Sequence, residues 1–242
     1  MYKIEIPISN KIYNGWTIGD EKEFLMNRSD TEDTEVILNE MYLYLLKDEE
    51  GHKYSINEKL YTLSIMKSYL YGDLVEVRYF CQHCNKDTEG AYSITNALKY
   101  TQPPKVIKLG DYVFHIHKNG DTVENSISKI ENTDKSIEEV VDEELTIKEY
   151  NILRDLVNKT KEGETLEIEA EIPCLLCGAS TFSKIDKDER IKNFIPNTIK
   201  DIYNIELNMK LKGNFTLQEV RSMYPYEVLV YSDLISAKMK GE

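Results

Sequence analysis

Apolar residues at the start of the chain follow a period of two. Isoleucines at positions 4, 6 and 8 alternate with polar residues, which predicts a strand, and Pro7 confines that strand to an edge or terminal position. The Asn14-Gly15 dipeptide is typical of a tight turn. We therefore expect a hairpin between about Lys11 and Ile18.

Apolar residues then change to helical spacing. Asp20 and Glu23 form a capping box, which predicts a short helix after them. The segment 34–46 carries apolar residues on one helical face, and a third helix begins at Ser55 and stops at Gly72.

One order of elements occurs twice in the chain. The helix that stops at Gly72 is followed by a strand and then by Cys81-Gln82-His83-Cys84. A helix that begins at the capping box of Thr146 and ends near Gly163 is followed by a strand and then by Cys174-Leu175-Leu176-Cys177. Two similar hairpins that face one another would bring two pairs of sulfur atoms to one point.

The remaining segments complete an α+β prediction. A β-rich and acidic insertion spans about 100–145, and residues 131–144 hold seven acids against one lysine, which is typical of a solvated helix or loop. After Lys184 the strand signals end, and Pro225 separates two of the predicted helices. We expect a mixed helix and β-hairpin body over 1–186 and a helical region over 187–242.

The four cysteines are the residues that specify chemistry. Cys81, Cys84, Cys174 and Cys177 form two C-x-x-C pairs with no cysteine left over, and two such pairs complete a tetrahedral zinc shell. The alternatives are disulfides or free thiols, and a redox dithiol. We predict one zinc bound by all four thiolates. Such a closed site stabilises the fold and leaves no position for substrate, and His83 is expected to face solvent.

Charge and composition narrow the class of protein. The formal net charge is −13 over 242 residues, which argues against nucleic acid or an anionic membrane surface as the main partner. We expect no signal peptide and no membrane span, and a reducing compartment in which paired thiols bind metal.

Catalytic patterns are not found in the sequence. It holds no G-x-S-x-G, no phosphate-binding glycine loop and no H-E-x-x-H. His115 and His117 share one face of a predicted strand, but no third ligand accompanies them, so a solvated face is favoured over a metal site. We expect a protein that is not an enzyme.

Two segments resemble a known family. Leu60–Ala91, with its helix, Gly72-Asp73, strand and Cys81-x-x-Cys84, resembles baseplate hub proteins of contractile-tailed, T-even-like bacteriophages, and Phe215–Tyr231 resembles a segment near the ends of such tail proteins. The acidic insertion before Thr146 departs from that pattern.

The resemblance implies a structural or assembly protein of the tail baseplate. Its location would be the virion, or the host cytoplasm during assembly. Its partners would be other phage tail and baseplate proteins, in an oligomer or hetero-complex, and the four cysteines would hold zinc. The alternative is an acidic zinc-ribbon adaptor that binds host or phage transcription machinery.

Overall fold

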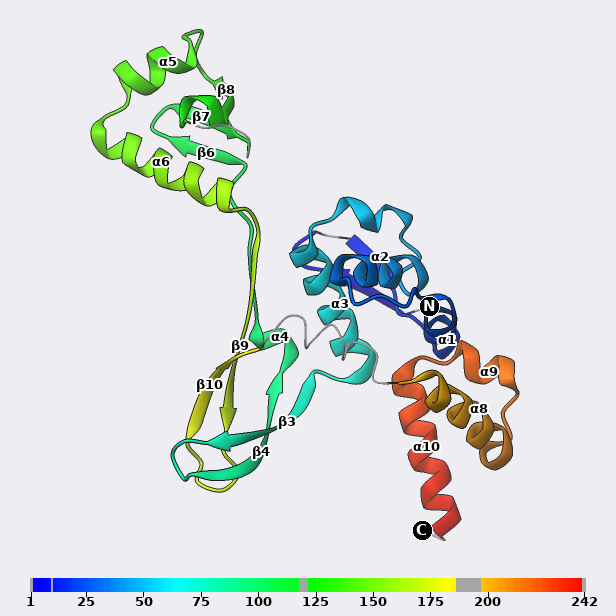
Figure 1. The fold of residues 1–242 in the computed structure, drawn as a ribbon. Coiled ribbons are helices and arrows are strands. Elements are labelled where there is room, and N and C mark those ends of the chain that lie inside the picture. The colour runs from blue at the N-terminus through cyan, green and yellow to red at the C-terminus, as the bar shows by residue number, and fades with distance from the viewer. Residues whose placement is uncertain (1, 10, 118–121, 186–196, 241–242) are drawn as a thin grey trace. The chain divides into compact units, whose positions relative to one another are not determined.

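The chain forms two compact units. A computed structural model describes residues 2–9, 11–117, 122–185 and 197–240. One unit comprises Met1–Lys99 and Glu167–Glu242, and the other comprises Tyr100–Leu166 (Figure 1). Both combine helices with small sheets of two or three strands, so the expected mixture of helix and β-hairpin is confirmed.

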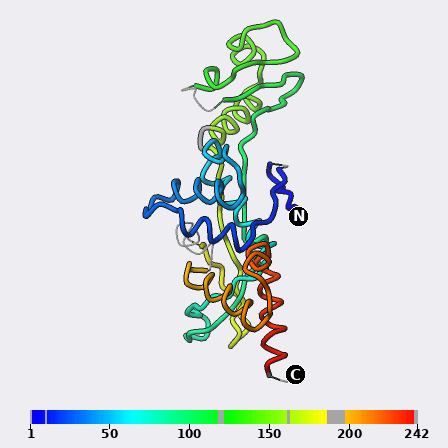
Figure 2. Tube along the Cα trace, turned by 90° about the vertical axis from the view of Figure 1, so that its right-hand side faces the viewer, coloured from blue at the N-terminus to red at the C-terminus, as the bar shows by residue number. Residues whose placement is uncertain are grey.

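The first unit contains most of the elements. Its helices are α1 (Ile18–Asn27), α2 (Thr34–Tyr44), α3 (Ile56–Tyr71), the single turn α4 (Ile94–Ala97), α8 (Ile199–Gly213), α9 (Leu217–Ser222) and α10 (Pro225–Lys240), with a 3-10 turn at Glu49–Lys53. Its strands are β1 (Lys3–Ile6), β2 (Lys11–Asn14), β3 (Leu74–Cys81), β4 (Lys86–Ser93) and β10 (Ser180–Lys184). Strands β5 (Leu98–Thr101) and β9 (Thr165–Pro173) carry the chain into and out of the second unit and are neighbours in the sheet β10-β9-β5 (Figures 1 and 2).

The first hairpin lies earlier in the chain than predicted. Strand β1 pairs with β2 in antiparallel register from Lys3↔Asn14 to Ile6↔Lys11, so the chain reverses after Ile6 and not at Gly15. Gly15 instead packs closely against Leu70, because a Cβ atom at position 15 would lie only 2.9 Å from Leu70 Cδ2. The glycine serves close packing, and the turn prediction at Asn14-Gly15 was wrong.

Local capping determines where the helices begin. Helix α1 starts two residues before Asp20, because Thr17 is the N-cap and Asp20 closes the capping box, so the predicted pairing of Asp20 with Glu23 was wrong. Helix α3 begins after Ser55 and ends at Gly72, whose φ of 98° is readily available to glycine, as predicted.

The C-terminal helices pack on the N-terminal part of the same unit. Ile18 of α1 is buried in one cluster with Ile202 and Met209 of α8, Val220 of α9 and Val228 of α10. The structure therefore does not place a unit boundary near residue 187, because these helices complete the core around α1. Residues 186–196 lie outside the described residues, and Pro225 opens α10 as the sequence predicted.

The second unit has its own core and is longer than the predicted insertion. An antiparallel sheet in the order β6 (Val106–Leu109), β7 (Tyr112–Ile116), β8 (Ile127–Glu131) packs against α6 (Ile147–Glu162). Phe114 lies fully buried beside Leu153 and Val157 of that helix. The acidic segment forms α5 (Ile137–Glu139) and a π-helical turn at Val140–Glu144, whose two valines are buried in the same core. A short 3-10 turn at Glu124–Ser126 precedes β8.

Candidate metal centre

Two hairpin ends bring the four cysteines together. Hairpin β3–β4 is in unbroken register from Leu74↔Ser93 to Cys81↔Lys86, and its loop contains Cys84. Hairpin β9–β10 is in register from Pro173↔Ser180 to Glu169↔Lys184, and its loop contains Cys174 and Cys177. The order predicted twice in the sequence therefore produces two hairpins that each present a C-x-x-C turn.

The sulfur positions match a tetrahedral metal site. The Sγ atoms of Cys81 and Cys177 lie 3.8 Å apart, those of Cys84 and Cys174 lie 3.8 Å apart, and all four lie within 4.8 Å of one another. A disulfide requires about 2.05 Å between sulfurs. Four sulfurs bonded to one tetrahedral metal at about 2.3 Å lie about 3.8 Å apart. The cluster is therefore able to hold a metal ion, and the four cysteines are free thiols, not disulfides.

Each turn depends on a residue with positive φ just after the second cysteine. Asn85 has φ 52° and Gly178 has φ 73°. In the second turn the Gly178 amide donates to the Cys174 carbonyl at 2.8 Å, and the Cys174 amide donates to the Ala179 carbonyl at 2.9 Å. These bonds fold the loop back on itself and aim both sulfurs inward. Glycine and asparagine suit this backbone, as the sequence predicted.

The cysteines of the cluster differ in their pKa values. Burial, with hydrogen bonds to neighbouring sulfurs, raises the pKa of Cys84 to about 12. Burial also opposes ionisation of Cys174, but amide groups of Cys177 and Leu176 donate to its sulfur and lower its pKa to about 6. At neutral pH the metal-free cluster thus retains protons that a divalent metal would displace.

The two hairpins also contact one another beside the sulfurs. The Tyr79 hydroxyl of β3 donates to the Ile172 carbonyl of β9 at 3.2 Å. A Cβ atom at Gly90 would lie 2.6 Å from Ile172 Cγ2, so a glycine is required where the strands approach. Thr88 is buried, its hydroxyl donates to the Glu89 carbonyl at 3.3 Å, and its side chain is one of the groups that lower the pKa of Cys174. The junction between hairpins β3–β4 and β9–β10 is therefore formed both by this close strand contact and by the four sulfurs.

The histidines singled out from the sequence do not join the cluster. His83 is exposed between its two cysteines, as expected. His115 is half-buried and lies 2.9 Å from a Glu131 oxygen through its Nε2 atom. Within the described part of the chain, the four cysteines are the one group of three or more potential ligands close enough for a metal.

A second polar site was missed by sequence reasoning. Lys22 of α1 donates to both carboxylate oxygens of Glu206 on α8 at 2.9 and 2.7 Å, and Arg221 of α9 donates to the same carboxylate at 2.7 Å. Lys22 also lies 4.2 Å above the Tyr203 ring. Lys22 and Glu206 are 184 residues apart, so no local pattern signals the pair.

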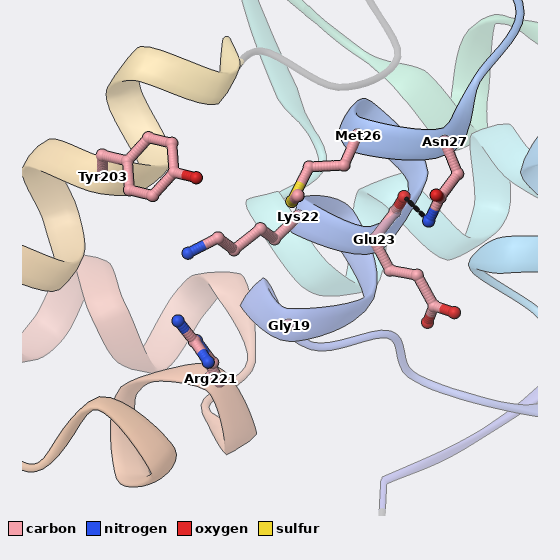
Figure 3. Close-up of a pocket in the computed structure, with 7 residues that line it drawn as sticks. All are labelled: Gly19, Lys22, Glu23, Met26, Asn27, Tyr203 and Arg221. Carbon is pink, nitrogen blue, oxygen red and sulfur yellow. Dashed lines mark hydrogen bonds between the residues drawn. The ribbon is translucent and has the colours of Figure 1, made fainter.

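An open pocket of about 490 Å³ lies beside this ion pair (Figure 3). Lys22, Tyr203 and Arg221 line it from three helices, with Met26 on its apolar side. The two cations are engaged with Glu206, and the residues that line the pocket include no nucleophile paired with a base. The pocket marks a structural junction between α1 and the C-terminal helices.

Glu21 is a further buried acid that the sequence does not distinguish. Its carboxylate accepts hydrogen bonds from Trp16 Nε1 at 2.8 Å, from Asn197 Nδ2 at 3.1 Å and from the Tyr71 hydroxyl. Burial raises the pKa of Glu21 above its ordinary value, although these three donors oppose the shift. The acid ties α1 to α3 and to Asn197, two residues before α8.

No protein family, curated protein or solved structure matches this chain. None of the helices in the described ranges has the length and apolar character that crossing a bilayer requires.

Proposed function

We propose that this protein is a non-enzymatic structural or assembly component of the baseplate, in the hub region, of a contractile-tailed, T-even-like bacteriophage. In this proposal Cys81, Cys84, Cys174 and Cys177 bind one structural zinc. The observation that carries the structural role is the convergence of four sulfurs, from two hairpins about ninety residues apart, at tetrahedral spacing.

Zinc is the metal that suits this donor set. A shell of four thiolates is soft, and a tetrahedral S4 geometry is typical of zinc or of iron–sulfur centres. Paired C-x-x-C turns around a single point fit one ion. Zinc has no redox chemistry, so its role would be to join the hairpins.

A structural role follows from the number of protein ligands. Catalytic zinc sites keep one coordination position for water or substrate, whereas four thiolates fill all of them. Two of the four sulfurs belong to buried residues, Cys81 and Cys174. The metal would therefore contribute folding energy, and the function would lie on the surfaces it holds in place.

The baseplate role is supported by the two segments that resemble hub proteins. The exposed apolar residues beside the metal centre support a role in assembly. Leu175 and Leu176, between the ligand cysteines, are 73% and 60% exposed, and Phe182 on β10 is 79% exposed. All three belong to the hairpin β9–β10, and large exposed apolar side chains are typical of contact sites for other proteins.

Mass spectrometry of particles and of lysates tests this proposal. Purified virions of the phage that encodes the chain should contain it at a low, fixed copy number, and in infected cells a tagged copy should co-purify with tail proteins. Absence from particles together with co-purification of RNA polymerase would support the adaptor instead. Metal analysis of the purified protein is a separate measurement, with one zinc per chain expected and iron or no metal contradicting the zinc assignment.

A further inference from the structure

Helix α10 has two apolar faces, and only one of them is packed. Val228 is 4% exposed, Ile235 packs against the same buried cluster, and the Tyr231 ring lies 5.1 Å from the Phe215 ring. These positions are three and four residues apart and form the inner face. They account for the attachment of α10 to its own unit.

The outer face of α10 carries a second apolar stripe. Val230 and Leu234 are four residues apart and are 53% and 60% exposed. Tyr226, one turn earlier on the same side, is 38% exposed, and its ring stacks on Tyr224 and lies beside Tyr2. Leu229, beside them, is 53% exposed. A lone amphipathic surface helix needs one apolar face, and the contacts of Tyr226 within the chain do not account for the exposed Leu229, Val230 and Leu234 that follow it.

The charges along α10 are segregated by sign. Both of its acids, Glu227 and Asp233, lie in the first nine residues, whereas Lys238 lies in the last turn. Glu227 and Lys238 are eleven residues apart, which is three helical turns plus about 20°, so they flank the stripe on the same side. In an antiparallel pair of identical helices related by a two-fold axis, the same flank of each helix lines one side of the interface, and the start of one helix lies beside the end of the other. Glu227 of each copy would then lie opposite Lys238 of the other copy, which gives two such pairs.

We propose that the outer face of α10 binds the same face of a second copy of this chain, in antiparallel orientation. Val230 then lies within about one residue of Leu234 of the second copy along the helix axis. The pairs of Glu227 with Lys238 lie at the two ends of the interface. The bulk of the chain, with a net charge of −13, would repel another copy. At α10 the separation of acidic and basic residues places opposite charges next to each other in the antiparallel pair, so a second copy is able to approach this helix.

One helix face is a small interface. Helix α10 is about 24 Å long, and stable dimers bury about 800 Å² on each partner, so we expect association at micromolar concentration or above. Asp233 lies near the two-fold axis, where the two copies of this carboxylate would approach each other. Removing that charge should strengthen the pair.

Sedimentation equilibrium of the full chain, from about 5 to 300 μM, tests the proposal across the expected affinity range. The wild-type chain should show a monomer–dimer equilibrium. Leu234→Glu should abolish the dimer, and Asp233→Asn should strengthen it several-fold. Leu207→Glu is the matched control, because Leu207 lies on α8 and is 54% exposed, yet lies outside the stripe.

A charge-exchange pair tests the orientation. Glu227→Lys and Lys238→Glu should each weaken self-association, while an equimolar mixture of the two should restore it. Circular dichroism checks that Glu227→Lys still folds, since Glu227 accepts from the Tyr224 amide at 2.8 Å. A monomer at all concentrations, a dimer unaffected by Leu234→Glu, or a mixture that does not recover would each overturn the proposal. These results are independent of the baseplate role, because they concern the purified chain alone.

Discussion

Replacing Cys81 or Cys174 by serine tests whether the two hairpins share one metal. Each cysteine belongs to a different hairpin, and their Sγ atoms are members of one cluster. Loss of either thiolate opens the same tetrahedral shell, so the two variants should lose nearly equal stability. Two unrelated pairs of cysteines would give unequal and additive losses.

The magnitude follows from binding linkage. A metal at about 1,000 times its dissociation constant stabilises the folded state by about 4 kcal/mol. The unit that contains the cluster has about 175 residues, for which 1 kcal/mol corresponds to a shift of roughly 2–4 °C in Tm. Each serine variant should therefore melt roughly 8–16 °C below the wild-type chain when zinc is present.

Thermal unfolding with zinc and with a chelator provides the assay. Chelation should lower the Tm of the wild-type chain. The two serine variants already have a lower Tm, and chelation should lower it little further. His83→Ser is the matched control, since His83 is exposed in the same turn and should leave Tm unchanged. A wild-type Tm insensitive to chelation, or clearly different losses for Cys81→Ser and Cys174→Ser, would refute the shared site.

Three further predictions concern the junction between α1 and the C-terminal helices. Glu206→Leu should destabilise the chain by about 3–5 kcal/mol, because it leaves the Lys22 ammonium buried without its partner, and the double variant Lys22→Met/Glu206→Leu should recover most of that loss in urea unfolding. The raised pKa of Glu21 means that its contribution to stability is present below about pH 4.5 and is lost as the pH rises through the folded-state pKa, so Glu21→Gln should remove that part of the pH dependence of the urea midpoint. A chain ending before residue 197 should be insoluble or poorly cooperative in thermal unfolding, since it exposes the buried Ile18; a well-folded product would contradict the packing described above.

Patterns that repeat over a few residues predicted the local structure well. The capping box at Thr146, the glycine at 72 and the two strands that lead into cysteine pairs all occur where the sequence indicated. Each signal acts within one turn or one strand, so it is visible without knowledge of the tertiary fold. The convergence of the cysteines was also predictable, because their number and spacing leave few alternatives.

Long-range packing accounts for what the sequence did not reveal. Gly15 was misread because its neighbour Leu70 is 55 residues away, and a glycine needed for close packing resembles a glycine needed for a turn. The boundary near residue 187 was inferred from the end of strand signals. Helices that complete a distant core look the same in sequence as helices of a separate domain, and the Lys22–Glu206 pair that joins them has no local signature.

The position of the second unit within the chain bears on the metal centre. Cys84 and Cys174 are 90 residues apart, and closing a loop of that length in an unstructured chain costs about 4.6 kcal/mol. Residues Tyr100–Leu166 of that loop fold around their own core, and β5 and β9 at its ends are neighbours in one sheet. With those ends joined, about 22 residues remain to be closed, at a cost of about 3.4 kcal/mol. Folding of the second unit would therefore lower the cost of bringing the four cysteines together by about 1.2 kcal/mol, a factor of roughly eight in an equilibrium constant, without supplying a ligand.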